Sequence, residues 1–126
     1  MKIISPRVHG ILDYFVGVIL MGSPWLFGFA AGGAETWIPV ILGLVFIIYS
    51  LFTDYPLGVS PLISMRAHLS MDILGGIFLA VSPWLFRFSD AVFIPHLVFG
   101  IISIAAGVMT NPASESSHEQ RHRHAH

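Results

Sequence analysis

Four long apolar stretches, separated by short polar segments, set the pattern of this chain. They run over residues 8–29, 37–53, 67–88 and 91–109. Each stretch has roughly the 17–25 residues that an α-helix needs to cross the hydrocarbon core of a bilayer. The pattern therefore predicts an all-α protein, a polytopic membrane four-helix bundle, and it excludes ordinary buried strands, which are much shorter.

The composition indicates that a bilayer is the solvent. Of the 126 residues, 55% are hydrophobic and 10% are charged, which is far from the average of a soluble domain. We expect a single membrane domain over residues 1–110. Residues 111–126 are polar and begin with the helix-stopping pair Asn111-Pro112, so we expect them to form a disordered, His-rich cytoplasmic tail.

Several functions do not fit this composition. The chain has no cysteine, which excludes a thiol oxidoreductase, a disulfide scaffold and an iron–sulfur cluster as self-contained functions. Its net charge is -1 and its basic residues are scattered, so we expect no nucleic-acid partner. The sequence contains no nucleophile–base arrangement and no nucleotide motif, and we therefore expect no enzymatic activity.

The basic residues predict how the helices are oriented. Lys2, Arg7 and Arg66 fall on one side of the predicted membrane, together with the arginines that follow the fourth helix, whereas Arg87 falls on the other side. Because Lys and Arg favour the cytoplasmic side, both termini and the middle loop are predicted to be cytoplasmic. The absence of organellar targeting features favours a bacterial-type inner membrane.

The first half of the chain is repeated in the second half. The shift that places Arg7 on Arg66 also places His9 on His68 and Asp13 on Asp72, and it indicates repeats at about residues 7–54 and 66–110. Because each repeat crosses the membrane twice, the two keep one orientation, and we expect two parallel-related helical hairpins. The histidine at position 96 has no counterpart in the first repeat and is expected at the interface.

A Ser-Pro-Trp triplet lies towards the outer end of the first and of the third predicted helix. Proline removes one backbone donor, so a kink or a helix end is expected there. The serine hydroxyl can bond the carbonyl that proline leaves free, and the indole suits the membrane interface. A substrate gate hinged at the prolines is the alternative interpretation. The residues concerned are Ser23, Pro24, Trp25, Ser82, Pro83 and Trp84.

The residues that recur in both repeats form one stripe along the first helix and again along the third. We expect these two helices to face each other across a pseudo-two-fold axis, with Gly17 and Gly76 allowing close approach. Gly43 and Gly100 are further packing positions on the second and fourth helices. Near the cytoplasmic end of the stripe, four ionisable residues are expected to converge: His9, Asp13, His68 and Asp72.

Three interpretations of this His/Asp quartet stay open. In the first it is a polar clasp that specifies packing, with each His paired to the Asp one turn away. In the second it relays protons or binds a solute that crosses the membrane. In the third, His9 and His68 hold a divalent metal ion, or ligate a haem from opposite faces, with the Asp residues supporting them. The leading expectation is the clasp, without a cofactor.

The sequences at residues 22–27 (GSPWLF) and 81–86 (VSPWLF) resemble the signature of the SPW-repeat membrane proteins. That family is described as a two-helix repeat with Ser-Pro-Trp in its first helix, and the resemblance covers nearly all of the chain except the tail. It implies an integral membrane protein and brings no catalytic residues with it. We therefore predict a structural or partner-binding membrane module that contacts lipid and a second copy or another membrane protein; the alternative is a small oligomeric permeation or proton-coupled transport unit.

Overall fold

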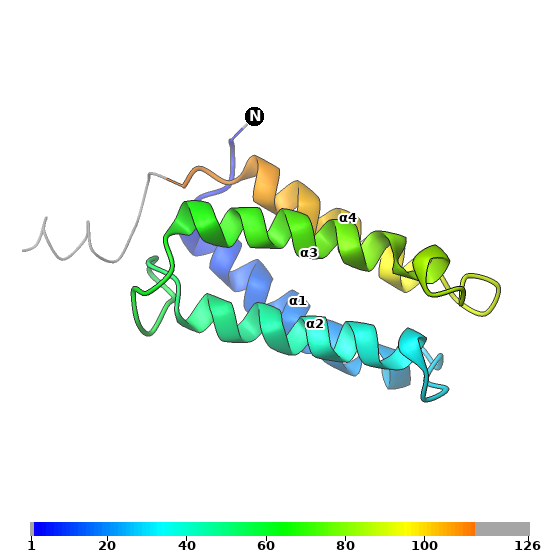
Figure 1. Ribbon diagram of the computed structural model, residues 1–126. Coiled ribbons are helices and arrows are strands. Elements are labelled where there is room, and N and C mark those ends of the chain that lie inside the picture. The colour runs from blue at the N-terminus through cyan, green and yellow to red at the C-terminus, as the bar shows by residue number, and fades with distance from the viewer. Residues whose placement is uncertain (1, 113–126) are drawn as a thin grey trace, which may run out of the picture.

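The computed structural model describes residues 2–112, and this part of the chain folds into four α-helices without β-strands (Figure 1). The all-α class and the four predicted helices are confirmed, and every helix begins and ends within about one turn of the predicted residue. The remainder of the predicted tail, residues 113–126, lies outside the described residues. The helices are α1 (Pro6–Leu26), α2 (Ala34–Leu51), α3 (Met65–Leu85) and α4 (Ile94–Met109).

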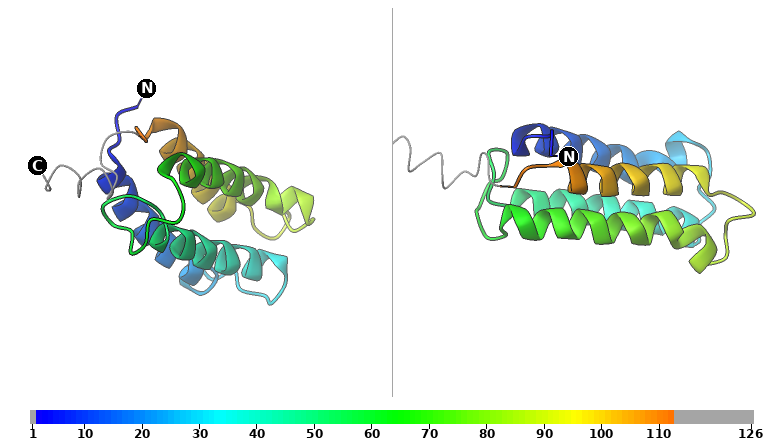
Figure 2. Two further views of the ribbon diagram at one scale, coloured as in Figure 1. Left: turned by 60° about the vertical axis from the view of Figure 1, so that its left-hand side comes forward. Right: turned by 90° about the horizontal axis from the view of Figure 1, so that it is seen from above.

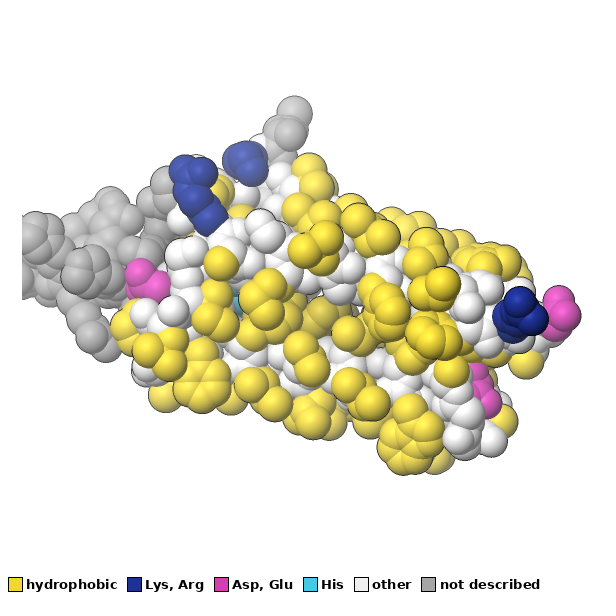
Figure 3. Space-filling model, in the orientation of Figure 1, with side chains coloured by type: hydrophobic (Ala, Val, Ile, Leu, Met, Phe, Trp, Pro, Cys, Tyr) yellow, Lys and Arg dark blue, Asp and Glu magenta, His cyan; other side chains and the backbone are white. Residues whose placement is uncertain are grey.

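The surface of the bundle is apolar over most of its length. Figure 3 shows hydrophobic side chains covering the middle of one face, with charged side chains gathered at the two ends. By length and composition, α2 and α3 are each able to cross a membrane, and α4 is a shorter apolar helix of 16 residues. Large side chains such as Phe15 and Leu74 are 64% and 68% exposed, which suits contact with lipid and not with water.

The helices pair into two antiparallel hairpins, α1 with α2 and α3 with α4 (Figures 1 and 2). Glycines make each pairing close. A Cβ atom on Gly43 would lie 2.7 Å from the carbonyl oxygen of Gly17, and a Cβ atom on Gly100 would lie 2.6 Å from that of Gly76. The two backbones are therefore in direct contact within each hairpin.

This position of the glycines differs from the sequence-based expectation. Gly17 and Gly76 were expected to bring α1 and α3 together, but each lies in the seam of its own hairpin. A short outer turn holds the two helices of a hairpin in antiparallel contact along their length, and close backbone approach gains most where the contact is longest. Between the hairpins the packing uses large side chains instead: Leu20 of α1 and Leu79 of α3 share one buried cluster with Phe46 and Tyr49 of α2.

At one end of the bundle, short stretches of extended chain tie the two hairpins together. Ile4 donates its N–H to the Met109 carbonyl oxygen at 3.0 Å and accepts from the Asn111 N–H at 3.0 Å, which fixes the start of α1 beside the end of α4. The middle loop makes the matching connection, because the Ile63 N–H donates to the Phe52 carbonyl oxygen at 2.8 Å and fixes the start of α3 beside the end of α2. These bonds bring the start of each hairpin close to the end of the other hairpin.

The Ser-Pro-Trp triplets lie at the opposite end, where α1 and α3 stop two residues after the proline. Proline has no N–H to donate to the carbonyl four residues earlier. In both helices the serine takes over this role: Ser23 Oγ donates to the Leu20 carbonyl oxygen and Ser82 Oγ to that of Leu79, each at 2.7 Å. The two tryptophans, Trp25 and Trp84, are 60% and 51% exposed, as suits a side chain at a membrane interface.

Candidate functional site: a buried His/Asp ring between the hairpins

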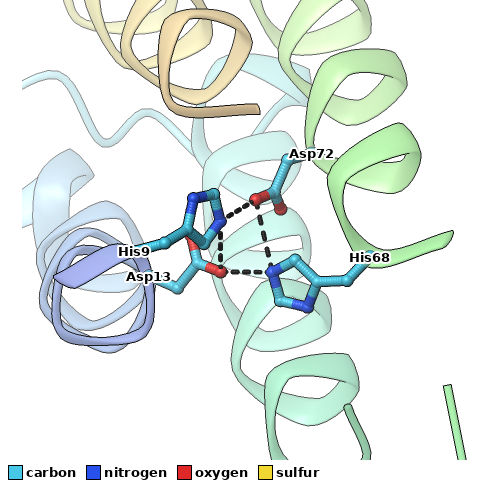
Figure 4. A group of neighbouring side chains, drawn as sticks. All are labelled: His9, Asp13, His68 and Asp72. Atoms are coloured by element: carbon cyan, nitrogen blue, oxygen red, sulfur yellow. Dashed lines mark hydrogen bonds and ion pairs between the residues drawn. The ribbon is translucent and has the colours of Figure 1, made fainter. Parts of the chain in front are cut away.

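The four residues of the quartet lie together between the two hairpins, with His9 and Asp13 on α1 and His68 and Asp72 on α3 (Figure 4). His9 Nε2 lies 2.5 Å from Asp72 Oδ2 and 3.0 Å from Asp13 Oδ2. His68 Nε2 lies 3.3 Å from Asp72 Oδ2 and is hydrogen-bonded to Asp13 Oδ2. Two imidazole nitrogens and two carboxylate oxygens therefore alternate around a closed ring.

The closest contacts of this ring run between the helices and not along them. The sequence suggested that each His pairs with the Asp one turn away on its own helix, but those contacts are the longer ones in the ring. His9 is closest to Asp72 and His68 is closest to Asp13. Because every such contact joins α1 to α3, the ring connects the two hairpins.

The ring is almost completely shielded from solvent. His9 and His68 are 0% exposed and Asp72 is 2% exposed, whereas the Asp13 side chain keeps 12% of its surface exposed. Ionised groups in such surroundings are costly unless they are paired and hydrogen-bonded. The ring meets this requirement for the Nε2 and Oδ2 atoms, so the outer atoms of the four side chains need partners of their own.

Two threonines hold the outer nitrogens of the histidines. Thr110 Oγ1 lies 2.6 Å from the Ala106 carbonyl oxygen and 2.8 Å from His9 Nδ1. A hydroxyl has one proton, and a carbonyl oxygen can only accept, so this proton goes to Ala106 and Thr110 Oγ1 accepts from a protonated Nδ1. Thr53 repeats this geometry, at 2.6 Å from the carbonyl oxygen one turn earlier and 2.8 Å from His68 Nδ1. Both Nδ1 atoms therefore carry a proton.

The hydrogen bonds to threonine also cross between the hairpins. Thr110 follows α4 and accepts from His9 of α1, whereas Thr53 follows α2 and accepts from His68 of α3. Thr53 and Thr110 occupy equivalent positions near the ends of the two repeats, but they were not predicted as part of the site. Their recurrence at equivalent positions was the available signal. It did not reveal that the start of one hairpin packs against the end of the other.

The carboxylates have further support from α2. The Tyr49 hydroxyl donates to Asp72 Oδ1, and Ser50 Oγ, whose main bond goes to the Phe46 carbonyl oxygen at 2.7 Å, lies 3.4 Å from Asp13 Oδ2. Tyr49 is 5% exposed and was not predicted as a site residue. An aromatic residue near a predicted helix end is usually read as an interfacial anchor, and the sequence has no feature that directs this hydroxyl inwards.

Replacing Thr110 with valine is expected to lower the free energy of unfolding by about 1–2 kcal/mol, because the buried Nδ1–H of His9 would lose its acceptor while side-chain shape is kept. The free energy is measured by titrating the purified protein from mild detergent into SDS and following helicity. The control is Ser70→Ala, which removes a hydroxyl on the exposed face of α3 that donates to the Arg66 carbonyl oxygen at 3.1 Å. An equal loss in Ser70→Ala contradicts the assignment.

A further buried histidine, His96, joins the hairpins at the other end of the bundle. It is 1% exposed, so its side chain is buried between the helices. Its Nε2 lies 2.9 Å from the Glu35 carbonyl oxygen and therefore donates to it. The ring lies near Phe29 and Phe88, with centroid separations of 5.1 and 4.9 Å, and Nδ1 has no hydrogen-bond partner within residues 2–112. His96 is remote from the quartet along the chain and belongs to a separate contact.

These features define a class: an all-α membrane protein with an apolar exterior, in which paired helices are joined by buried polar residues. Its two Ser-Pro-Trp triplets narrow the class further. The model of the SPW repeat domain matches residues 7–110, and the chain belongs to this family. No curated protein and no solved structure matches the chain.

Proposed function

We propose that this protein is a non-enzymatic membrane module whose two hairpins are locked into one unit by the His/Asp ring. The observation that carries the proposal is the alternation of His Nε2 and Asp Oδ2 atoms between α1 and α3. Each residue of the ring contacts two others, so removing any one of them leaves buried polar atoms without partners. The ring thus favours one arrangement of the hairpins over others.

Charge balance supports a clasp. Both histidines carry a proton on Nδ1, and a second proton on each Nε2 would make two imidazolium ions that face two carboxylates. The ring is then neutral as a whole, which reduces the cost of placing it in a low-dielectric environment. Buried polar groups of this kind are known to specify register and partner choice in helical assemblies, at some cost in stability.

The proposed module spans the membrane several times, with the ring towards the cytoplasmic side. Lys2, Arg7 and Arg66 belong to the end of the bundle that holds the ring, and Arg87 to the other end, which favours this orientation by the positive-inside rule. We propose a bacterial-type inner membrane as its location. The exposed apolar side chains along the helices then contact lipid and a second copy of the chain or another membrane protein.

The ring geometry favours the clasp over haem ligation. Two histidines that bind a haem from opposite faces need a porphyrin plane between their Nε2 atoms. Here both Nε2 atoms contact the same two carboxylate oxygens, within 3.3 Å, and a porphyrin would have to separate them. A relay of protons across the membrane would need an unbroken line of polar groups. An apolar cluster that contains Leu20, Leu79 and Phe46 instead separates the ring from the buried His96 at the other end of the bundle.

A flux measurement separates the module from a transport unit. We expect vesicles that contain the purified protein, loaded with a pH-sensitive dye and given a pH gradient, to lose the gradient no faster than protein-free vesicles. The same result is expected for Asp13→Asn, the variant of the most exposed member of the ring. Faster decay in the wild type that Asp13→Asn abolishes would instead support proton transport and would contradict the proposal.

A further inference from the structure

Both histidines donate their Nδ1–H away from the centre of the His/Asp ring, so the Nε2 atoms that face the carboxylates are stabilised by positive charge. Nδ1–H of His9 donates to Thr110, and Nδ1–H of His68 donates to Thr53. In a neutral imidazole the other nitrogen, Nε2, then carries a lone pair. Both lone pairs point at carboxylate oxygens, so the ring holds four electron-donating atoms that face one another. Either a proton on each Nε2 or one doubly charged cation between the four atoms removes this repulsion.

We propose that the ring of His9, Asp13, His68 and Asp72 is a binding site for one divalent transition-metal ion. This inference rests on the proposed clasp, because the ion would join the same four atoms. Two imidazole nitrogens and two carboxylate oxygens form a ligand set that suits Zn²⁺, Co²⁺ or Fe²⁺. Two Nε2 protons leave when the ion enters, so charge is conserved: two positive charges are exchanged for two.

The dimensions of the ring fit a tetrahedral ion after a small expansion. The four candidate ligand atoms all lie within 4.8 Å of one another. In a tetrahedral site with metal–ligand bonds of about 2.0–2.1 Å, neighbouring ligand atoms are about 3.3 Å apart. Along each helix the contacts are already close to this value, at 3.0 Å from His9 Nε2 to Asp13 Oδ2 and 3.3 Å from His68 Nε2 to Asp72 Oδ2. Between the helices, His9 Nε2 lies 2.5 Å from Asp72 Oδ2. The helices therefore need to separate by less than about 1 Å to admit the ion.

The surroundings of the ring are those of a metal site. Histidines that bind metals almost always donate their other N–H group to an oxygen, which orients the ring. Thr110 and Thr53 provide this oxygen at 2.8 Å for both histidines, and the Tyr49 hydroxyl orients Asp72 through its second oxygen. Four protein ligands fill a tetrahedral ion and leave no place for substrate, so a structural metal is expected. Asp13, with 12% of its side chain exposed, marks the route of entry.

Cobalt provides a direct test, because tetrahedral Co²⁺ absorbs visible light far more strongly than the hydrated ion. The experiment uses the full-length chain in mild detergent, purified without a polyhistidine tag, with the C-terminal histidines replaced by glutamine so that they cannot bind the metal. These substitutions are His118→Gln, His122→Gln, His124→Gln and His126→Gln. We expect one equivalent of Co²⁺ to bind per chain, with an intense visible band, and one equivalent of Zn²⁺ to displace it with loss of the band.

Variants of this chain show where the ion binds. Asp72→Asn and His68→Gln are each expected to weaken Co²⁺ binding by more than a hundredfold, whereas Thr110→Val is expected to weaken it by about 10–100-fold, as for other residues that orient a ligand. His96→Gln, which removes a buried histidine outside the ring, is the matched control and should bind Co²⁺ like the parent. Helicity and elution from a sizing column confirm that each variant is folded.

Two outcomes would overturn the metal site. One is a folded parent protein that binds no stoichiometric Co²⁺; the other is equal binding in the parent and in the folded His9→Gln/His68→Gln variant. Neither outcome depends on the clasp, which is tested by stability in the presence of a chelator. If Co²⁺ binds but the chelator-treated protein is no more stable than Asp72→Ala, the clasp fails and the metal site stands.

Discussion

Replacing Asp72 with alanine is expected to lower the free energy of unfolding by about 3–5 kcal/mol, the cost of removing one partner from a buried charged pair. Asp72 accepts hydrogen bonds from His9 and Tyr49 and also lies 3.3 Å from His68 Nε2. Without the carboxylate, these three groups remain buried with fewer partners, and one negative charge of the ring is lost. The measurement is an SDS titration of the protein in mild detergent, followed by helicity, with a chelator present.

Asp90→Ala is the matched control for this prediction. Asp90 is exposed in the turn between α3 and α4. Its replacement by alanine is expected to change the free energy of unfolding by less than about 0.5 kcal/mol. A double-mutant cycle between His9 and Asp72 then isolates their interaction, which should amount to about 0.5–3 kcal/mol. Equal effects of Asp72→Ala and Asp90→Ala would mean that the ring does not hold the hairpins together.

Replacing Gly100 with alanine is expected to destabilise the second hairpin by about 3 kcal/mol, at the upper end of the range for an overpacked site. The added Cβ atom would lie 2.6 Å from the Gly76 carbonyl oxygen and 2.7 Å from the Ala80 backbone nitrogen. Backbone atoms cannot rotate away as a long side chain does, so α3 and α4 would have to move apart along their seam. The same SDS titration measures the loss.

Gly22→Ala tests whether this effect comes from the seam. Gly22 also lies within a helix, but a Cβ atom there would meet nothing within 4 Å. Alanine is the better helix former by about 1 kcal/mol, so this variant is expected to be as stable as the parent or slightly more stable. If Gly100→Ala is tolerated as well as Gly22→Ala, the hairpins do not depend on close backbone contact.

Gly100→Ala and Asp72→Ala disturb two different kinds of helix contact. The glycine seams hold each hairpin together from within, through small residues on two helices that follow each other in the chain. The His/Asp ring acts between the hairpins by joining α1 to α3, where α2 also packs against α3 and α1 against α4. We therefore expect Gly100→Ala to loosen one hairpin and Asp72→Ala to loosen the connection between the two.

Much of the candidate site could be predicted before its geometry was known. The stripe of His9 and Asp13, and its counterpart at His68 and Asp72, indicated convergence because an ionisable residue in an apolar helix needs a polar neighbour. The direction of the pairing could not be predicted, since a His and an Asp one turn apart satisfy the same requirement locally. Whether the closer partner lies on the same helix or on another depends on the distance between α1 and α3.

The residues that hydrogen-bond to the quartet from other helices could not be predicted from the sequence, for a similar reason. Thr53 and Thr110 follow helices whose ends lie far along the chain from the histidines they hold, and Tyr49 is one of several aromatic residues in an apolar segment. Their roles depend on which helix ends meet. The extended segments at Ile4 and Ile63 determine this by hydrogen bonds between backbone atoms, and such bonds leave no mark in the identity of the side chains.

The sequence by itself determined the all-α class, the number of helices and their approximate ends, because the length and apolarity of a segment are properties of neighbouring residues. It also indicated a kink or a helix end at the Ser-Pro pairs, since proline lacks the donor that a helix requires. Only the tertiary structure decided that the glycines pack within hairpins, that His9 contacts Asp72 and that threonines orient both imidazoles. These choices depend on the packing of segments distant in the chain, where several arrangements bury the same residues and the geometry of the bundle selects one.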